Sequence, residues 1–226
     1  MSDGRSQTLA AIRRSLKRGE IAGAAAAPLE ARLKDHRRNL IPARATSLDH
    51  LGQVALFVKM AEGVQASVAR VSTAADVPGE IAQYLAALNL PAKAVLAPDP
   101  SLDDIPWQDR PLLDLHKGRA EDGDGAGITA CFAGIAETGT LMLLSGPESP
   151  TRNNFLPDTH IVILRDKQIL AAYEDGWDAL RAKNTGMPRT VNFITGPSRT
   201  ADIEQRIELG AHGPRRLHIV LIDDGK

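Results

Sequence analysis

The sequence predicts an α/β domain in which a mainly parallel β-sheet is covered by helices on both faces, with a helical appendage at the N-terminus. Short runs that are apolar throughout recur along the chain, and stretches with helical periodicity separate them. Continuously apolar strands belong to sheets buried on both sides, and alternating strands and helices are typical of parallel sheets. The 226 residues suit one domain of about 200 residues plus an appendage.

Residues 1–46 are predicted to form this appendage, an N-terminal helical arm and linker. Leu9, Ile12 and Leu16 recur at helical spacing with basic residues between them, which indicates a short amphipathic helix. Such a helix packs on the domain or on a neighbouring subunit, or it binds a membrane surface or an acidic partner. The small residues of 19–28 predict a linker.

The α/β domain is predicted to cover residues 47–226. Its first helix is indicated by one apolar face, formed by Leu48, Leu51, Val54, Ala55 and Val58. Apolar runs predict strands, at 65–71, 94–96, 128–133, 141–144, 161–164, 191–194 and 217–222. Periodicity predicts further helices over 78–89, through Leu170, Trp177 and Leu180, and through Ile203, Ile207 and Leu209. The region 98–127 is rich in Asp, Gly and Pro and is predicted to be irregular, with Trp107 packing it onto the domain.

Charge and cysteine content exclude several classes of protein. Lys and Arg total 27 and Asp and Glu total 28, so we expect no nucleic-acid-binding surface over the whole protein. Cys131 is the only cysteine in the sequence, and one thiol neither closes an intrachain disulfide nor holds a four-cysteine iron–sulfur cluster. The first residues lack the apolar core of a signal peptide, and no run reaches the roughly 18 apolar residues of a membrane span. The expected location is a reducing cytoplasm.

A polar turn between two apolar strands, at 134–140, is the first segment suited to chemistry. It places Glu137 beside Thr138, Gly139 and Thr140. Glycine lets the backbone approach a ligand closely, and a carboxylate at such a loop serves as a general base or as a nucleophile toward an activated acyl group. The alternative is a tight turn whose glutamate caps neighbouring backbone amides.

A second polar segment follows the predicted strand 191–194 and precedes a predicted helix. It contains the run Gly196, Pro197, Ser198, Arg199 and Thr200. The start of a helix offers unpaired N–H groups and the positive end of the helix dipole, and an arginine fork suits a carboxylate or phosphate. Asp202 and Glu204 supply negative charge to the same helical turn, so simple capping is the alternative to anion binding.

The third segment lies just before the last predicted strand and contains His212 and Arg215. A histidine exchanges protons near neutral pH, and an arginine holds anionic groups. The alternative is a structural turn, because no partner is fixed for His212. The sequence has no metal-ligand spacing, no phosphate-binding or dinucleotide glycine motif and no nucleophile elbow.

Taken in order, four motifs resemble the lactate-utilisation (LUD) domain. They are Ala136-Glu137-Thr138-Gly139-Thr140, the run 156–160, Gly196 to Glu204, and His212-Gly213-Pro214-Arg215 with Leu217-His218. The resemblance extends from residue 47 to the C-terminus. Within this group the chain is similar to lactate-utilisation protein C, because proteins A and B carry the cysteine-rich regions that it lacks.

The resemblance implies a component of a system that oxidises L-lactate to pyruvate. It implies no cofactor in this chain and iron–sulfur clusters on the partner proteins A and B. A homo-oligomer and a small carboxylate or phosphate ligand are compatible with it. It also implies a fold similar to that of the sugar isomerases and CoA-transferases, in which a glutamate attacks an acyl-CoA thioester. By that fold analogy alone, Glu137 is compared with this nucleophile.

These observations lead to three hypotheses. In the first, Arg199 and the loop 196–200 bind a small anion such as the substrate carboxylate, while Glu137 and His212 handle protons. In the second, the chain is a stand-alone transferase or ligase with Glu137 as nucleophile. In the third, it is a scaffold whose basic N-terminal helix docks a partner. The first requires the loop 196–200 to lie close to the glutamate turn.

Overall fold

The computed structural model describes residues 3–19, 21, 23–38, 40–203, 206–210 and 212–223. The chain divides into two compact units, residues 1–40 and 41–226. The sequence analysis placed this boundary between residues 46 and 47. The structure assigns 41–46 to the larger unit, where the short helix α3 (Ala43–Thr46) buries Ala45 completely in the core.

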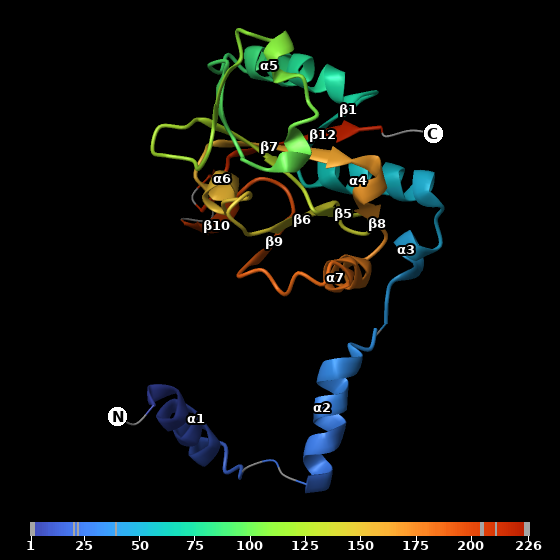
Figure 1. Ribbon diagram of the computed structural model, residues 1–226, viewed down its shortest axis with the longest axis vertical. Helices are drawn as coiled ribbons and strands as arrows, with labels where there is room; N and C mark the ends of the chain where they lie inside the picture. The colour runs from blue at the N-terminus through green and yellow to red at the C-terminus, as the bar shows by residue number, and fades with distance from the viewer. Residues whose placement is uncertain are drawn as a thin grey trace. The chain divides into compact units, whose positions relative to one another are not determined.

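The N-terminal unit consists of two short helices, α1 (Gly4–Ser15) and α2 (Ala26–Asp35) (Figure 1). The predicted amphipathic helix is confirmed as α1, and its N-cap Asp3 accepts a hydrogen bond from the backbone N–H of Arg5. The predicted linker is wrong at its end, because α2 begins inside 19–28. Alanine is the strongest helix former, so this alanine run continues into a helix. Neither helix buries a described side chain.

A six-stranded parallel sheet forms the centre of the larger unit, in the order β1-β12-β7-β4-β2-β3 (Figure 1). The strands are β1 (Ser67–Val71), β2 (Lys93–Leu96), β3 (Asp114–Lys117), β4 (Ala126–Ala130), β7 (Thr159–Arg165) and β12 (Arg216–Ile222). The α/β fold with a parallel sheet is confirmed. Strand β3 lies in the region predicted to be irregular, whose Trp107 packs against the core as predicted and donates a hydrogen bond to the Leu102 carbonyl.

A second sheet of four strands has the order β8-β5-β6-β9. Its strands are β5 (Ala133–Ile135), β6 (Thr140–Leu144), β8 (Ile169–Leu170) and β9 (Val191–Ile194). Helix α7 (Tyr173–Ala182) packs on this sheet through Leu180 and Trp177. The predicted helix through Leu170 therefore starts later than expected, because Leu170 belongs to β8.

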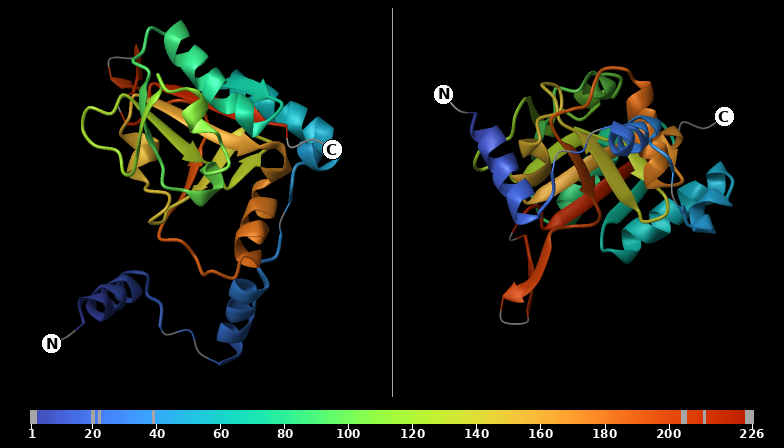
Figure 2. Two further views of the ribbon diagram at one scale, coloured as in Figure 1. Left: turned by 45° about the horizontal axis from the view of Figure 1, so that its top comes forward. Right: turned by 90° about the horizontal axis from the view of Figure 1, so that it is seen from below.

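The predicted helix through Ile203, Ile207 and Leu209 is wrong. The chain forms an antiparallel hairpin there, β10 (Arg199–Ile203) with β11 (Arg206–Leu209), and Figure 2 shows it extending from the body of the domain. Short apolar runs do not separate strand from helix by periodicity, and β-branched isoleucine favours strands. This correction matters for function, because the loop 196–200 does not open a helix.

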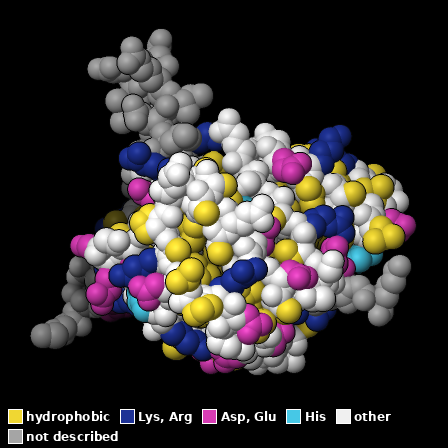
Figure 3. Space-filling model, turned by 90° about the horizontal axis from the view of Figure 1, so that it is seen from above, with side chains coloured by type: hydrophobic (Ala, Val, Ile, Leu, Met, Phe, Trp, Pro, Cys, Tyr) yellow, Lys and Arg dark blue, Asp and Glu magenta, His cyan; other side chains and the backbone are white. Residues whose placement is uncertain are grey.

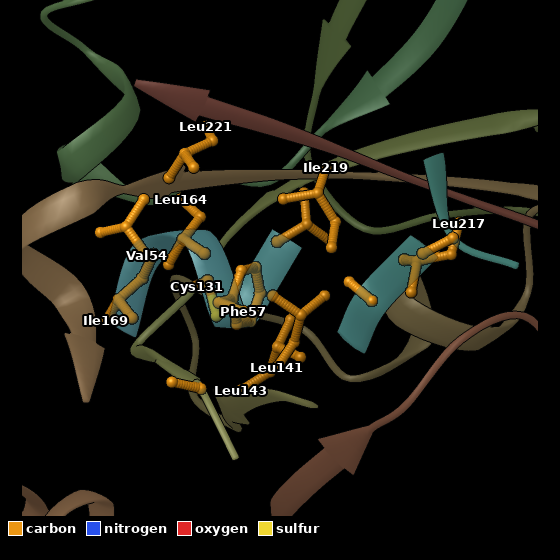
Figure 4. Packing of buried hydrophobic residues seen from close by; sticks show 14 of the residues in the cluster. Val54, Phe57, Cys131, Leu141, Leu143, Leu164, Ile169, Leu217, Ile219 and Leu221 are labelled. Atoms are coloured by element: carbon orange, nitrogen blue, oxygen red, sulfur yellow. The ribbon is translucent and has the colours of Figure 1, made fainter. Parts of the chain in front are cut away.

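Alternate residues of β12 face two different cores, as the two-residue repeat of a strand requires. Leu217, Ile219 and Leu221 pack with α4 (His50–Gly63) and the small sheet (Figure 4). Val220 and Ile222 pack with α5 (Val77–Ala87) on the opposite face. The central sheet is therefore covered on both faces, as predicted.

The buried face of α4 differs from the predicted one. Val54, Phe57 and Ala61 are buried, whereas Leu51 is 74% exposed. Both sets recur at helical spacing, so the apolar residues of this helix are consistent with two overlapping faces. Packing against the second sheet selects the face that contains Phe57.

The surface seen from above α5 carries basic, acidic and hydrophobic side chains intermingled, without a continuous basic area (Figure 3). That distribution agrees with the near-zero net charge. Among the described residues, no helix combines the length and the apolar character needed to cross a membrane.

Candidate functional site

A cavity of about 220 Å³ lies where β7 and β12 begin. Two of the segments selected from sequence meet in its wall, 196–198 and 212–214. Hydrogen bonds hold them together, since the Ser198 N–H donates to the Pro214 carbonyl over 2.8 Å and the His212 N–H donates to Ser198 Oγ over 3.3 Å. The structure thus brings Gly196, Pro197, Ser198 and His212 into the wall of one cavity.

Two polar side chains in the wall of this cavity are completely buried. Asn154 is 1% exposed, and neither its amide oxygen nor its amide nitrogen has a hydrogen-bond partner among the described residues. His160 is 0% exposed, and its Nδ1 also has no partner there. Leaving such groups unpaired costs about 1–3 kcal/mol each, so they are candidate contacts for a ligand or an ordered water molecule. Phe155, Phe193 and Leu217 supply apolar wall around them.

His160 keeps its neutral form at physiological pH. Burial lowers the pKa of its imidazole to about 3, because the charged form is poorly solvated in the interior. Its Nε2 lies 2.8 Å from Thr129 Oγ1. The direction of that hydrogen bond decides whether Nδ1 donates or accepts, so the ring offers one uncharged polar contact.

We expect the free energy of unfolding to fall as the pH is lowered from 6.5 toward 3, in part because of His160. Its imidazole titrates at 6.5 when unfolded and at about 3 when folded, so the unfolded chain binds the extra proton between these values. The contribution is complete above pH 6.5 and declines below it by roughly 1.4 kcal/mol per pH unit. Urea unfolding at pH 7 and pH 5 measures this slope.

His160→Gln keeps a polar side chain but removes the titration, so its stability should depend less on pH over this range. The matched control is His116→Gln at a histidine whose side chain is 43% exposed, and it should keep the wild-type slope. Equal slopes for wild type and His160→Gln would show that this imidazole does not contribute.

The glutamate turn lies beside the cavity but not in its wall. Glu137 is 7% exposed, the Tyr173 N–H donates to its Oε1 over 3.5 Å, and Arg44 donates to its backbone carbonyl. It is absent from the described residues that line the cavity. This position corresponds to the structural alternative, in which the turn is fixed by hydrogen bonds to the backbone.

Four hydroxyl groups link the glutamate turn to the cavity. Tyr173 Oη lies 3.1 Å from Thr138 Oγ1 and 2.9 Å from Thr140 Oγ1. Thr140 Oγ1 lies 2.6 Å from the Oγ1 of Thr195, which lines the cavity. The antiparallel pairing of β6 with β9 produces this contact, because Leu141 is opposite Ile194. Thr195, the residue that precedes the loop 196–200, thus connects this loop to the glutamate turn, although the turn itself does not line the cavity.

The two arginines selected from sequence lie outside the cavity wall. Arg199 donates a hydrogen bond to the Val64 carbonyl at the end of α4, and Arg215 Nε is 3.8 Å from Asp158 Oδ1 at the surface. The helix dipole invoked for Arg199 does not exist, since β10 begins there. The side chain of Thr200 lies outside the described residues. Among the described lining residues there is no Lys or Arg, so the cavity is polar without a permanent cation.

Sequence reasoning missed the two buried polar residues that distinguish this site. Neither Asn154 nor His160, which lies within β7, was among the candidates. The sequence signal for them is weak, namely a polar run that leads directly into a continuously apolar strand. Cys131 is buried, and burial raises the pKa of its thiol to about 12. Among the described residues, no group of three or more His, Cys, Asp or Glu side chains is arranged to hold a metal ion.

A parallel α/β domain with a half-open cavity, walled by apolar side chains and a few buried polar groups, has the architecture of a small-molecule-binding domain. Comparison with protein families identifies the family. The LUD domain model matches residues 54–222. The chain belongs to the LUD domain family.

Relatives of known name are found in several bacteria. A lactate utilization protein C of Deinococcus radiodurans is 34% identical over 156 residues, which cover 66% of this chain and 70% of the relative. A protein of the same name from Bacillus subtilis is 35% identical over 130 residues, 54% of each chain. An uncharacterized protein of Neisseria meningitidis is 35% identical over 131 residues, 58% of this chain and 55% of the relative. The matched region thus spans about half the length of several relatives.

A solved structure supports the fold. The crystal structure of a DUF162 family protein from Deinococcus radiodurans superimposes with a TM-score of 0.59 at 27% identity. The match covers 77% of this chain and 99% of that chain. The family and the α/β architecture are therefore established by both sequence and structure.

Proposed function

We propose that this chain is a component of lactate utilisation and that its cavity binds a small hydroxy or oxo acid, with L-lactate and pyruvate as the reference ligands. The names of the relatives support the pathway. In this proposal the iron–sulfur partners, proteins A and B, carry the electrons, because the chain itself has one cysteine. Helix α1, basic and without a buried side chain, is available to bind them.

The observation that carries the proposed ligand is the pair of unpartnered polar groups in the cavity wall. The Asn154 amide offers one donor group and one acceptor, and His160 Nδ1 offers a third polar atom. L-Lactate presents a carboxylate, a neighbouring hydroxyl and one methyl group. These match the amide, the imidazole and the apolar wall, so one small molecule satisfies what the protein leaves unpaired. A volume of about 220 Å³ lies below the range usual for drug-sized ligands, which favours a small acid.

In this proposal, some of the residues selected from sequence contact the ligand, and others hold the contacting segments in place. Ser198 and His212 line the cavity and supply further hydrogen-bonding groups for a carboxylate. Arg199 fixes the position of the loop through its hydrogen bond to the Val64 carbonyl at the end of α4. Glu137 helps to fix the turn that carries Thr138 and Thr140, and thereby the network of hydroxyl groups. Proton transfer is assigned to His212, the lining histidine that is exposed.

Asn154→Leu should weaken binding of L-lactate by at least about tenfold, because loss of a hydrogen bond to a charged group costs about 1.5–3 kcal/mol. Leucine has nearly the shape of asparagine, so the cavity keeps its size. Isothermal titration calorimetry of the full chain with L-lactate, D-lactate, pyruvate and inorganic phosphate measures the effect.

The matched control is Asn192→Leu. Asn192 also has a buried amide nitrogen without a partner among the described residues, but it does not line the cavity. Its variant should bind like wild type. Undiminished binding in Asn154→Leu, or equal losses in both variants, would reject the proposed site. The transferase alternative has less support, because Glu137 lies outside the cavity wall; a covalent adduct on Glu137 after incubation with acyl-CoA would favour it instead.

A further inference from the structure

A second polar cluster lies on the other face of the central sheet. The parallel register of β1 with β12 places Ser67 opposite His218, and Arg216 lies two residues before His218 on the same strand. Residues two apart on a strand face the same side. Helix α5 packs against β1 and β12 (Figures 1 and 2), and its residues Glu80 and Tyr84, four apart, lie on one helical face.

The side chains of this cluster form a chain of close contacts. Ser67 Oγ lies 2.8 Å from His218 Nδ1. Glu80 Oε1 lies 3.7 Å from His218 Nε2, beyond hydrogen-bond distance, and this nitrogen has no hydrogen-bond partner among the described residues. The ring of Tyr84 stacks on the imidazole with 3.8 Å between centroids and 9° between planes. His218 is 3% exposed, whereas Ser67 is exposed at the edge of the sheet. A buried base thus connects an accessible hydroxyl to a carboxylate.

We propose that Ser67 is a nucleophile that accepts acyl groups from activated esters or thioesters, with His218 as its general base and Glu80 as the residue that orients His218. A nucleophile within hydrogen-bond distance of a base, which is itself oriented by a third group, is the arrangement that activates serine. The site is separate from the cavity at Asn154 and does not depend on the proposed function.

The proton balance of the step follows from the geometry. Ser67 Oγ attacks the acyl carbon while its proton passes to His218 Nδ1, and the bond from that carbon to the leaving oxygen or sulfur breaks. His218 then returns the proton to the leaving group. Water releases the acyl group from Ser67 with His218 again as base. Burial lowers the pKa of His218 to about 4, so the imidazole starts neutral at pH 7.

Two neighbouring groups are placed to stabilise the oxyanion of this reaction. Tyr84 stacks on the imidazole of His218, and burial, the largest effect on its hydroxyl, raises the pKa of that group, so that it keeps its proton. Arg216 interacts electrostatically with Tyr84. Tyrosine hydroxyls and positive charges are common oxyanion stabilisers.

The full chain treated with a fluorophosphonate probe, followed by peptide mass spectrometry, tests the proposal. We expect stoichiometric labelling of Ser67 and none after Ser67→Ala. His218→Gln should slow the labelling about 100-fold, since a general base contributes 10²-fold or more, and Glu80→Gln should slow it less. Ser72→Ala, at an exposed serine near the end of the same strand, is the matched control and should label like wild type.

A second measurement covers the case in which the buried His218 variant fails to fold. Ser67→Cys changes only the exposed position, and its thiol should react with iodoacetamide faster than the thiol of Ser72→Cys at the same pH, because the adjacent neutral imidazole takes up the proton during the attack. A purely structural serine would give a thiol of ordinary reactivity. Absence of label on Ser67, labelling of Ser72 at the same rate, or alkylation of Ser67→Cys no faster than that of Ser72→Cys would overturn the proposal.

Discussion

Phe57→Ala is expected to lower the free energy of unfolding by about 3–5 kcal/mol, the usual cost of removing a buried aromatic ring. The ring is 0% exposed and lies at the centre of the core between α4 and the small sheet (Figure 4). It packs directly over the backbone of Gly134, where an added Cβ would lie 3.0 Å from the ring. Leu141 and Leu164 belong to the same core and lie on hydrogen-bonded strands. Because these strands are held in place, the cavity left by the ring cannot collapse easily.

Equilibrium unfolding in urea measures this loss. The control is Leu51→Ala on the same helix, where the side chain is 74% exposed and the change should stay within about 0.5 kcal/mol. The comparison also decides which face of α4 is buried, since the sequence pattern predicted Leu51 and not Phe57. Equal losses for the two variants would contradict the orientation of the helix.

Gly139→Ala should destabilise the domain by roughly 2–4 kcal/mol. Gly139 has a φ of +66°, and an added Cβ would lie 2.3 Å from the backbone nitrogen of Ala61 and 2.6 Å from the carbonyl carbon of Met60. A methyl group costs about 1 kcal/mol at such a φ, and forcing it against backbone costs about 1–3 kcal/mol more. The end of α4 would have to move away from the glutamate turn.

Gly186→Ala separates these two effects. Gly186 has a φ of +79°, and an added Cβ there has no described atom within 4 Å, so its variant should lose only the backbone contribution of about 1 kcal/mol. Thermal and urea unfolding of both variants give the difference. If Gly186→Ala loses as much as Gly139→Ala, the close approach of the turn to α4 is not the cause. Gly139→Ala should also weaken L-lactate binding, because Thr138 and Thr140 flank the substituted residue.

Both proposed sites lie near the beginning of strand β12, on opposite faces of the central sheet, but they differ in chemistry. The cavity at Asn154 and His160 is half open and offers uncharged groups to a small acid. The cluster at Ser67 and His218 is open at the sheet edge and presents a nucleophile. In both, a histidine held neutral by burial is the central group, so both sites depend on the packing of the strands that carry it.

The sequence by itself was sufficient for the architecture. Continuously apolar strands such as Ile161–Leu164 and Leu217–Ile222 identified a sheet buried on both faces, because only such strands lack a polar side. Loop segments 196–200 and 212–215 were recognised as functional candidates, and six of their residues line the cavity. The order of the motifs along the chain also identified the family, because motifs and their order are read from the sequence without coordinates.

The tertiary structure alone decided which residues meet and which face is buried. The hairpin at Arg199–Leu209 replaced a predicted helix, and Phe57 replaced Leu51 in the core, because periodicity in a short segment fits more than one arrangement. Ser67 meets His218 across a gap of 151 residues, and Asn154 and His160 line one cavity with the segments 193–198 and 212–214. Such contacts depend on the order and register of the strands. Order and register are set by many interactions between segments that are far apart in the chain, so no single stretch of sequence reveals them.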